Sequence, residues 1–276
     1  MVYLLLRRTM SDSFVVVVAT AIFALHPAHI ESVAWISGLT DPLMTIPLIG
    51  SLLCWLRYRE RKQVASLIVS LLLLLTALMV KETAAITPFL LFAYAHAMSR
   101  EEDSHSPLRD AARTFVPYAL VLAGYLVVRW RALRGEYSTP VRPLGEAIVN
   151  LPAMTWFYVR HLLWPLRLSV IYDFDLSRRR GVLVIAAIAV IAIVMAAGIL
   201  AARRSGALLM AWAWIVFPIV PAIVGVTAFD PHDFVHDRYL YLPTLGLGIL
   251  LGVLLRHLQI GTRELFGKPA MPTAAA

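Results

Sequence analysis

The chain has 276 residues, of which 60% are hydrophobic and 15% charged, with a formal net charge of +8. Soluble domains are typically about 45–50% apolar and about 25% charged, so this composition excludes an ordinary soluble domain. The excess of cations lies in short segments between apolar runs, which indicates membrane topology and anionic lipid headgroups and argues against a nucleic-acid partner.

Long apolar segments recur along the chain. A bilayer core of about 30 Å needs ~20 apolar residues at helical rise, and backbone groups in lipid must be bonded within the segment, so these runs predict transmembrane helices. The predicted segments are, in chain order, 14–25, 42–56, 64–80, 83–98, 114–130, 181–202, 207–228 and 239–258. The fold class expected is therefore all-α, a polytopic transmembrane bundle of about eight spans over 1–258, followed by a short cytoplasmic tail at 259–276.

One further segment, 131–180, differs from the spans. Its centre, AIVNLPAMTWFYVRHLLWPL, is rich in aromatic residues and is interrupted by Pro152, Arg160, His161 and Pro165. That composition favours an interfacial or re-entrant helix over a span.

The basic segments predict an orientation. The segment RYRERK at 57–62, the pair Arg203–Arg204 and the run 256–268 are basic, and the positive-inside rule places such segments in the cytoplasm. Alternation of the spans then places 26–41, 81–82, 131–180 and 229–238 on the outer side. We therefore expect an integral membrane protein, of a bacterial inner membrane, whose outer loops face the periplasm or exterior.

Most of the ionisable side chains that could act in catalysis or binding lie on the predicted outer side. They include two histidines and two acids in the first loop, Lys81 and Glu82 in the second, and further acids, histidines and Arg238 in the later loops. Ionisable groups at a membrane edge are costly to desolvate, so this set is a candidate functional site. The alternative is that these are solvated loop residues. The lone Cys54 lies in an apolar run, and we expect no catalytic role for it.

Four ordered motifs carry a resemblance to a known family. They are FALHPAHIESVAWISGLTD (23–41), KETAAITP (81–88), LLWPLRLSVIYD (162–173) and DRYLYLPTLGLG (237–248). Together they are similar to the membrane glycosyltransferase-like proteins of the TMTC type, polytopic proteins with the GT-C fold. The resemblance implies transfer of a sugar from a polyprenyl-phosphate donor to an acceptor protein, glycan or lipid at the outer face, as in the O-mannosyltransferases of that family.

Three departures from the family pattern are expected to matter. The chain begins at what resembles the end of the family's second span, so the acidic first outer loop is expected to be missing, and no tetratricopeptide repeats follow Leu258. Leu39 stands where the family carries a basic residue. The chain is therefore expected to be an N-terminally truncated, weakly active version of such an enzyme.

Glycosyl transfer to a hydroxyl needs a carboxylate to accept the proton and cations to stabilise the leaving phosphate. The candidate carboxylates are Glu31, Asp41 and Asp237, and the candidate phosphate ligands are Lys81, Arg238, Arg178 and Arg179. The further candidates for the site are His26, His29, Glu82 and Tyr239, the last with packing at the membrane interface as its alternative role.

A divalent metal held by these histidines and carboxylates is chemically feasible, although their spacing is not specific for one. A helix beginning at Pro27 would place His26 and His29 on neighbouring faces with Glu31 pointing elsewhere. The rival from another class is a non-catalytic membrane scaffold or lipid-binding partner subunit. A carrier is disfavoured, because the predicted spans are nearly free of central charge.

Overall fold

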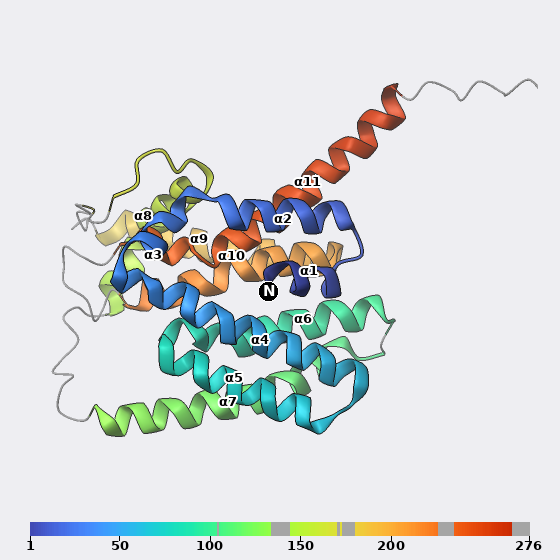
Figure 1. Cartoon of the computed structure of the whole chain (residues 1–276). Helices are drawn as coiled ribbons and strands as arrows, with labels where there is room; N and C mark the ends of the chain where they lie inside the picture. Colours follow the sequence, from blue (N-terminus) through green and yellow to red (C-terminus); the bar gives the residue numbers. More distant parts are fainter. Residues whose placement is uncertain (104, 134–143, 170–171, 173–179, 226–234, 267–276) are drawn as a thin grey trace, which may run out of the picture.

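A computed structural model describes residues 1–276 except 104, 134–143, 170–171, 173–179, 226–234 and 267–276 (Figure 1). Every regular element in these described ranges is a helix. The α-helices are α1 (Val2–Thr9), α2 (Ser13–Leu25), α3 (Ile30–Ala34), α4 (Thr40–Arg61), α5 (Val64–Val80), α6 (Thr87–Glu101), α7 (Pro107–Ala132), α8 (Leu144–Leu163), α9 (Arg180–Arg204), α10 (Gly206–Gly225) and α11 (Pro243–Phe266). Four 3₁₀-helical turns lie between them, namely η1 (Pro27–His29), η2 (Ile36–Leu39), η3 (Glu82–Ile86) and η4 (Asp237–Leu240).

Each of the eight predicted apolar segments contains a helix, so the all-α prediction is confirmed. Among the described residues, four helices are long and apolar enough to cross a membrane: Ile36–Arg61, Pro107–Ala132, Val184–Arg204 and Gly206–Ile223. A fifth span results if Ser13–Leu25 and Pro27–Ala34, which meet at an angle of 47°, are counted as one. Val64–Val80 and Pro243–Gln259 are apolar but shorter. By these criteria the described residues contain four or five candidate spans of a membrane protein, and the eight spans predicted from the sequence are not confirmed.

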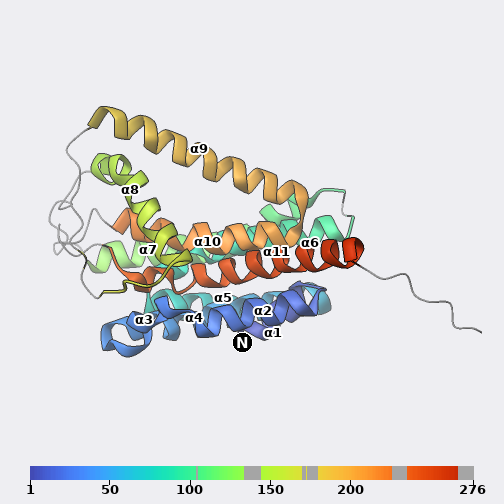
Figure 2. The same ribbon diagram turned by 90° about the horizontal axis from the view of Figure 1, so that it is seen from above.

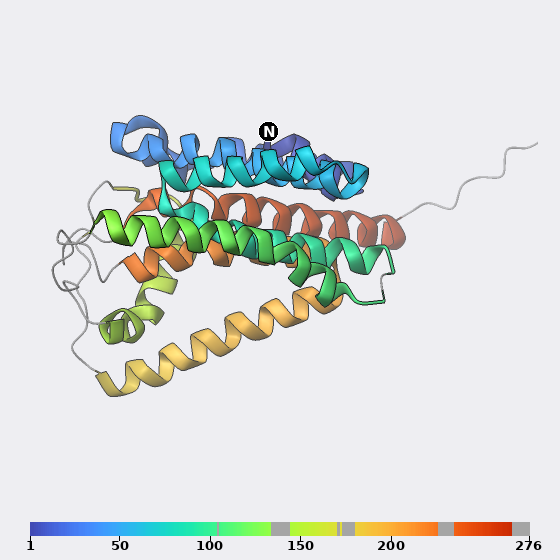
Figure 3. The same cartoon turned by 90° about the horizontal axis from the view of Figure 1, so that it is seen from below.

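The helices run back and forth between two ends of the bundle (Figures 1 and 3). One end, here called the site end, carries η1, α3, η2, η3 and η4. The other, the far end, carries the turns between α4 and α5, α6 and α7, and α9 and α10. The described parts of the loops that the sequence placed on the outer side therefore lie at the site end, and the described parts of those placed inside lie at the far end.

Glycines bring α11 close to its neighbours. A Cβ on Gly248 would lie 2.7 Å from the carbonyl oxygen of Ala19 in α2, and one on Gly246 would lie 2.5 Å from that of Ala211 in α10. Small residues allow helix backbones to approach in this way when no hydrophobic effect between lipid-solvated helices drives the contact. The motif that contains both glycines thus sets how α11, and the turn η4 before it, sits against α2 and α10.

Several buried polar side chains of the bundle are paired with one another. The hydroxyls of Ser51 and Ser70 each donate to the other residue's carbonyl, at 2.7 and 2.6 Å, and Tyr118 Oη lies 2.6 Å from Ser70 Oγ. In the same way the indole of Trp214 donates to Tyr94 Oη at 2.9 Å. These bonds join α4 to α5 and α7, and α10 to α6. They stabilise the contacts because an unpaired polar group is costly in an apolar interior.

Helix α9 lies partly apart from the compact bundle. Helix α9 converges with α10 toward the far end, where the indole of Trp212 donates to the carbonyl of Val194 at 3.0 Å, and diverges from it toward the site end beside α8 (Figure 2). Only 11% of the apolar window of α9 is buried, which fits a surface in contact with lipid. Helix α8 occupies the centre of the segment 131–180, and α11 continues past Leu258 to Phe266, where the sequence placed a tail.

Candidate active site

The first loop of the site end is fixed by two histidines. The backbone N–H of Ala28 donates to His26 Nδ1 at 3.2 Å, so Nε2 carries the proton and donates to the carbonyl of Leu162 in α8 at 3.0 Å. His29 Nε2 lies 2.8 Å from Thr244 Oγ1 and 3.2 Å from the carbonyl of Tyr241, at the start of α11. Both side chains thus position the loop and do not contact the candidate carboxylates. A 3₁₀ turn, η1, begins at Pro27 with His26 as its cap, which was one alternative that the sequence left open.

Gly38 allows η2 to fold back onto α3. A Cβ at this position would lie 2.3 Å from the carbonyl oxygen of Glu31, a distance that no side chain tolerates. The close approach places Trp35 and the first turn of α4 near Glu31. The two acids of this loop, ten positions apart in the sequence, are therefore held at one end of the bundle.

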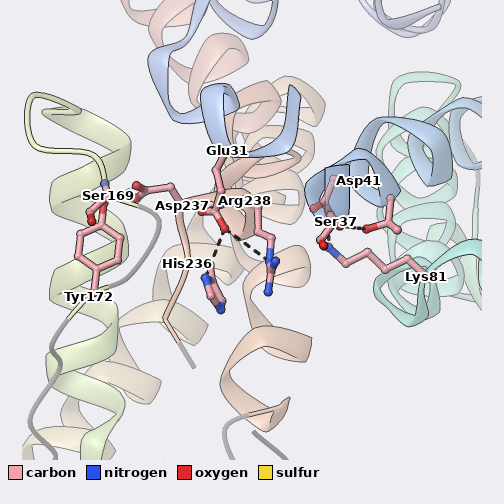
Figure 4. Close-up of polar contacts among 10 residues, drawn as sticks. Glu31, Ser37, Asp41, Lys81, Ser169, Tyr172, His236, Asp237 and Arg238 are labelled. Carbon is pink, nitrogen blue, oxygen red and sulfur yellow. Dashed lines mark hydrogen bonds and ion pairs between the residues drawn. The ribbon is translucent and has the colours of Figure 1, made fainter. Parts of the chain in front are cut away.

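Glu31 is the centre of the polar cluster. Its side chain is buried, and its Oε2 accepts a hydrogen bond from the backbone N–H of Arg238 at 3.0 Å. Its Oε1 lies 3.3 Å from His236 Nδ1 and 3.7 Å from Arg238 Nε. Both carboxylate oxygens thus face the segment 236–238, and Glu31 holds that segment against the first loop (Figure 4).

Asp41 forms an ion pair with Lys81 beside this centre. Lys81 Nζ donates to Asp41 Oδ1 at 2.6 Å, and the two side chains are 15% and 4% exposed. The second oxygen, Oδ2, is buried and has no hydrogen-bond partner among the described residues. One oxygen of Asp41 is therefore held and the other is left to accept a proton or a hydrogen bond.

The cations that pair with Glu31 and Asp41 lie over neighbouring aromatic rings. The guanidinium of Arg238 lies 5.2 Å from the ring centroid of Trp35 and 5.6 Å from that of Tyr239, and Lys81 Nζ lies 5.5 Å from the same Tyr239 ring. Cations at these distances are attracted by the ring quadrupole. Tyr239 is thus a shared platform for both candidate phosphate ligands.

Asp237 lies on the side of Glu31 opposite to Asp41 (Figure 4). Tyr172 Oη donates to Asp237 Oδ2 and itself accepts from the backbone N–H of Ser169 at 2.7 Å. Burial raises the pKa of the Asp237 carboxyl, while the hydrogen bond from Tyr172 and the nearby His161 oppose that shift. Its Oδ1 is buried without a hydrogen-bond partner among the described residues. A carboxylate with a raised pKa and a free oxygen is suited to accept a proton.

A cavity of about 270 Å³ opens beside His161 at the same end. It is lined by Arg160, His161, Trp164, Leu166 and Arg167. The ring of His161 lies 5.2 Å from that of Tyr172, which bonds Asp237, so the cavity adjoins the acidic cluster through one aromatic residue.

Not every predicted residue joins the cluster. Glu82 pairs with Arg129 and its side chain is 53% exposed, so it lies apart from the buried acids. Arg178 and Arg179 fall outside the described residues. Within the described ranges, no group of three or more His, Cys, Asp or Glu side chains is arranged to hold a metal ion. Glu31 and Asp41 are engaged by cationic side chains instead.

Several residues of the cluster were not assigned a role in the reaction from the sequence. His236, Tyr172 and His161 contact or adjoin the acids, and Trp35 stacks with Arg238. The sequence placed His236 and Tyr172 in outer loops, and Trp35 lies in the first motif, but only the packing of α8, α3 and η4 brings them to the carboxylates.

Comparison with known proteins gives a partial similarity. The chain is 35% identical over 99 residues to the Protein O-mannosyl-transferase Tmtc1 of Drosophila melanogaster. The aligned part makes up 36% of this chain and 11% of that protein. No family model matches the sequence, and no solved structure matches it. The chain is thus similar, over about a third of its length, to an O-mannosyl-transferase.

Proposed function

We propose that this chain is the membrane part of a glycosyltransferase, related to the TMTC type, that transfers a sugar from a polyprenyl-phosphate donor to an acceptor hydroxyl. The observation that carries the proposal is the meeting of three buried carboxylates with Lys81 and Arg238 at one end of an apolar bundle. The similarity to an O-mannosyl-transferase over 99 residues supports it.

The reaction requires one proton transfer and one bond exchange. The acceptor oxygen attacks the anomeric carbon, the bond from that carbon to the phosphate oxygen breaks, and the proton of the acceptor passes to a carboxylate. The sugar is then joined to the acceptor, and polyprenyl phosphate leaves. A membrane-embedded bundle suits this donor, because its hydrocarbon chain remains in lipid while its phosphate meets the protein at the membrane edge.

Asp237 is the proposed proton acceptor. Its raised pKa makes it a stronger base than an exposed aspartate, and its Oδ1 is free to meet the hydroxyl. Glu31 has both oxygens engaged with the segment 236–238, so we assign it a positioning role. Asp41 holds Lys81 in place, and its free Oδ2 makes it the second candidate for the base.

Lys81 and Arg238 are the proposed ligands of the donor phosphate. Each is held by a buried carboxylate and by the face of Tyr239, so each is oriented before a donor arrives. Preorganised cations in a site of low dielectric stabilise a leaving phosphate more strongly than cations in water. Arg238 can contact Glu31 and a phosphate at once, because its guanidinium has five N–H donors.

The membrane arrangement is part of the proposal. We infer that all eight predicted segments cross or enter the bilayer in a GT-C-like bundle, with the site end outside and the far end in the cytoplasm. The bent pair α2 and α3 and the shorter helices α5, α6 and α11 would complete the set beyond the four long spans. The positive charge of the turn segment 57–62 supports this orientation.

The test supplies polyprenyl-phosphate sugars to membranes that contain the chain and measures sugar transfer to protein and lipid acceptors. Mannosyl, glucosyl and arabinosyl donors are compared. Transfer that is lost in Asp237→Asn and Arg238→Gln but kept in Glu82→Gln would support the proposal, because Glu82 lies apart from the cluster. Binding of donor without transfer to any acceptor would favour the alternative of a lipid-binding scaffold.

A further inference from the structure

The far end of the bundle contains a cavity of about 510 Å³ that the proposed reaction does not use. It lies among α4, α5, α6 and α7. Its apolar walls include Trp55, Leu67 and Pro117, and it reaches Tyr118, whose hydroxyl is already bonded to Ser70 at 2.6 Å. The hydroxyl of Tyr118 at the inner wall therefore already has a hydrogen-bond partner. Donors without a partner must lie among the other lining residues.

The acids of this cavity are already engaged. Glu102 accepts from Arg59 Nη2 at 2.5 Å, and the same nitrogen donates to Ser99 Oγ at 3.2 Å. Asp110 has a further interaction of its own. Both acids that line the cavity thus interact with other residues.

Four donors of the cavity have no such partner. Lys62 and Arg113 are exposed and form no ion pair with a residue that the structure describes, and the hydroxyls of Tyr58 and Thr114 make no hydrogen bond within the same ranges. The position of Lys62 is fixed, because it caps α4 in the left-handed conformation, with φ at 55°, and its N–H donates to the carbonyl of Tyr58 at 2.7 Å. Two cations and two hydroxyls that line one cavity form a set of donors suited to an anion with several oxygens.

We propose that this cavity binds a phosphate group, either the phosphodiester of an anionic glycerophospholipid or free phosphate. The surroundings favour the lipid. Val64 on α5 and Leu120 on α7, each two positions along the chain from a lining residue (Lys62 and Tyr118), are 63% and 67% exposed, so acyl chains have an apolar surface on these helices on which to lie. Trp55 and the two tyrosines are residue types that proteins place at the level of lipid headgroups. The site is independent of the reaction proposed for the other end.

The test measures binding to the purified full chain in neutral detergent by native mass spectrometry. Phosphatidylglycerol, phosphatidylcholine and inorganic phosphate are titrated separately. We expect phosphatidylglycerol to bind more tightly than phosphatidylcholine, and the double variant Lys62→Gln/Arg113→Gln to weaken it about tenfold, the effect of losing about 1.4 kcal/mol of binding free energy. The matched control is Arg8→Gln/Arg204→Gln, which removes the same charge from exposed arginines of the far end that do not line the cavity.

The outcomes separate the two sources. Loss of phosphatidylglycerol binding in the cavity variant alone assigns the site to lipid, and displacement of that lipid by an equal concentration of inorganic phosphate assigns it to free phosphate. Equal binding by the cavity variant and the control, or equal binding of both lipids, overturns the proposal. If the double variant does not fold, Tyr58→Phe/Thr114→Val removes the two hydroxyl donors without a change of charge. It is then expected to weaken binding about fivefold.

Discussion

Asp41 and Lys81 form an ion pair in which Lys81 Nζ lies 2.6 Å from Asp41 Oδ1. The two residues lie at the ends of different helices, and their side chains are 4% and 15% exposed. Asp41 lies in the first turn of α4 and Lys81 caps α5, so the pair joins the two helices at the site end. The charges are buried together, and each depends on the other for compensation.

Removal of one partner should therefore cost more than removal of both. We expect Lys81→Met to lower the free energy of unfolding by about 3 kcal/mol, because it leaves Asp41 charged and unpaired in an apolar setting. Lys81→Met/Asp41→Asn should recover a large part of that loss. Thermal unfolding in detergent measures both. The exposed pair Arg129 and Glu82 is the control, and its removal should cost less than about 1 kcal/mol. A double variant as unstable as Lys81→Met would contradict this account.

Asp237→Asn tests the proposed proton acceptor. Loss of a general base typically lowers the rate by about 10²–10⁴-fold, and we expect that range for sugar transfer, with donor affinity little changed. A radiolabelled donor assay measures the rate, and equilibrium binding of the donor measures the affinity. If Asp41→Asn gives the larger loss and Asp237→Asn a minor one, the base is Asp41.

The pH dependence of the reaction should respond to Tyr172. Burial raises the pKa of Asp237 and the Tyr172 hydrogen bond lowers it, so Tyr172→Phe should raise that pKa further. A base must be deprotonated to act, so the rate falls as pH drops through its pKa. The acid limb of the pH–rate profile should thus move to higher pH in Tyr172→Phe. Tyr3→Phe, at an exposed residue of α1, should leave the profile unchanged.

Gly38 should not tolerate a side chain. A Cβ there would lie 2.3 Å from the backbone oxygen of Glu31, so Gly38→Ala must displace η2 from α3 and destabilise the protein by about 1–3 kcal/mol. Gly124→Ala is the matched control, because a Cβ at Gly124 has nothing within 4 Å and α7 should gain about 0.5–1 kcal/mol. Thermal unfolding compares the two variants. Equal stability of both would show that the close approach at Gly38 is not constraining.

The orientation can be tested by cysteine labelling in a Cys54→Ser background. Ser37 and Arg61 are both exposed; Ser37 lies in η2 at the site end, and Arg61 ends α4 at the far end. We expect a membrane-impermeant maleimide to label Ser37→Cys in intact cells and Arg61→Cys only after permeabilisation. The reverse pattern would place the acidic cluster in the cytoplasm and contradict the proposed reaction at the outer face.

Among the described residues, four of the eight predicted segments form long apolar helices, and the sequence did not indicate which ones. Hydropathy identifies apolar segments, but it does not separate a 17-residue helix such as α5 from one that extends across the full bilayer core. The sequence also did not predict that α2 and α3 form a single bent pair. Its angle depends on contacts of His26 with α8 and of His29 with α11, which no local pattern contains.

The sequence by itself determined the helical class and the sorting of loops to two ends, because long apolar segments must satisfy their backbone groups internally and successive helices must alternate in direction. Only the tertiary structure decided which polar residues meet. Glu31 contacts Arg238 across most of the chain length, and Asp237 meets Tyr172 through the packing of α8. These contacts depend on how closely α11 approaches its neighbours, which Gly246 and Gly248 permit, and glycine spacing alone does not specify the partner helix.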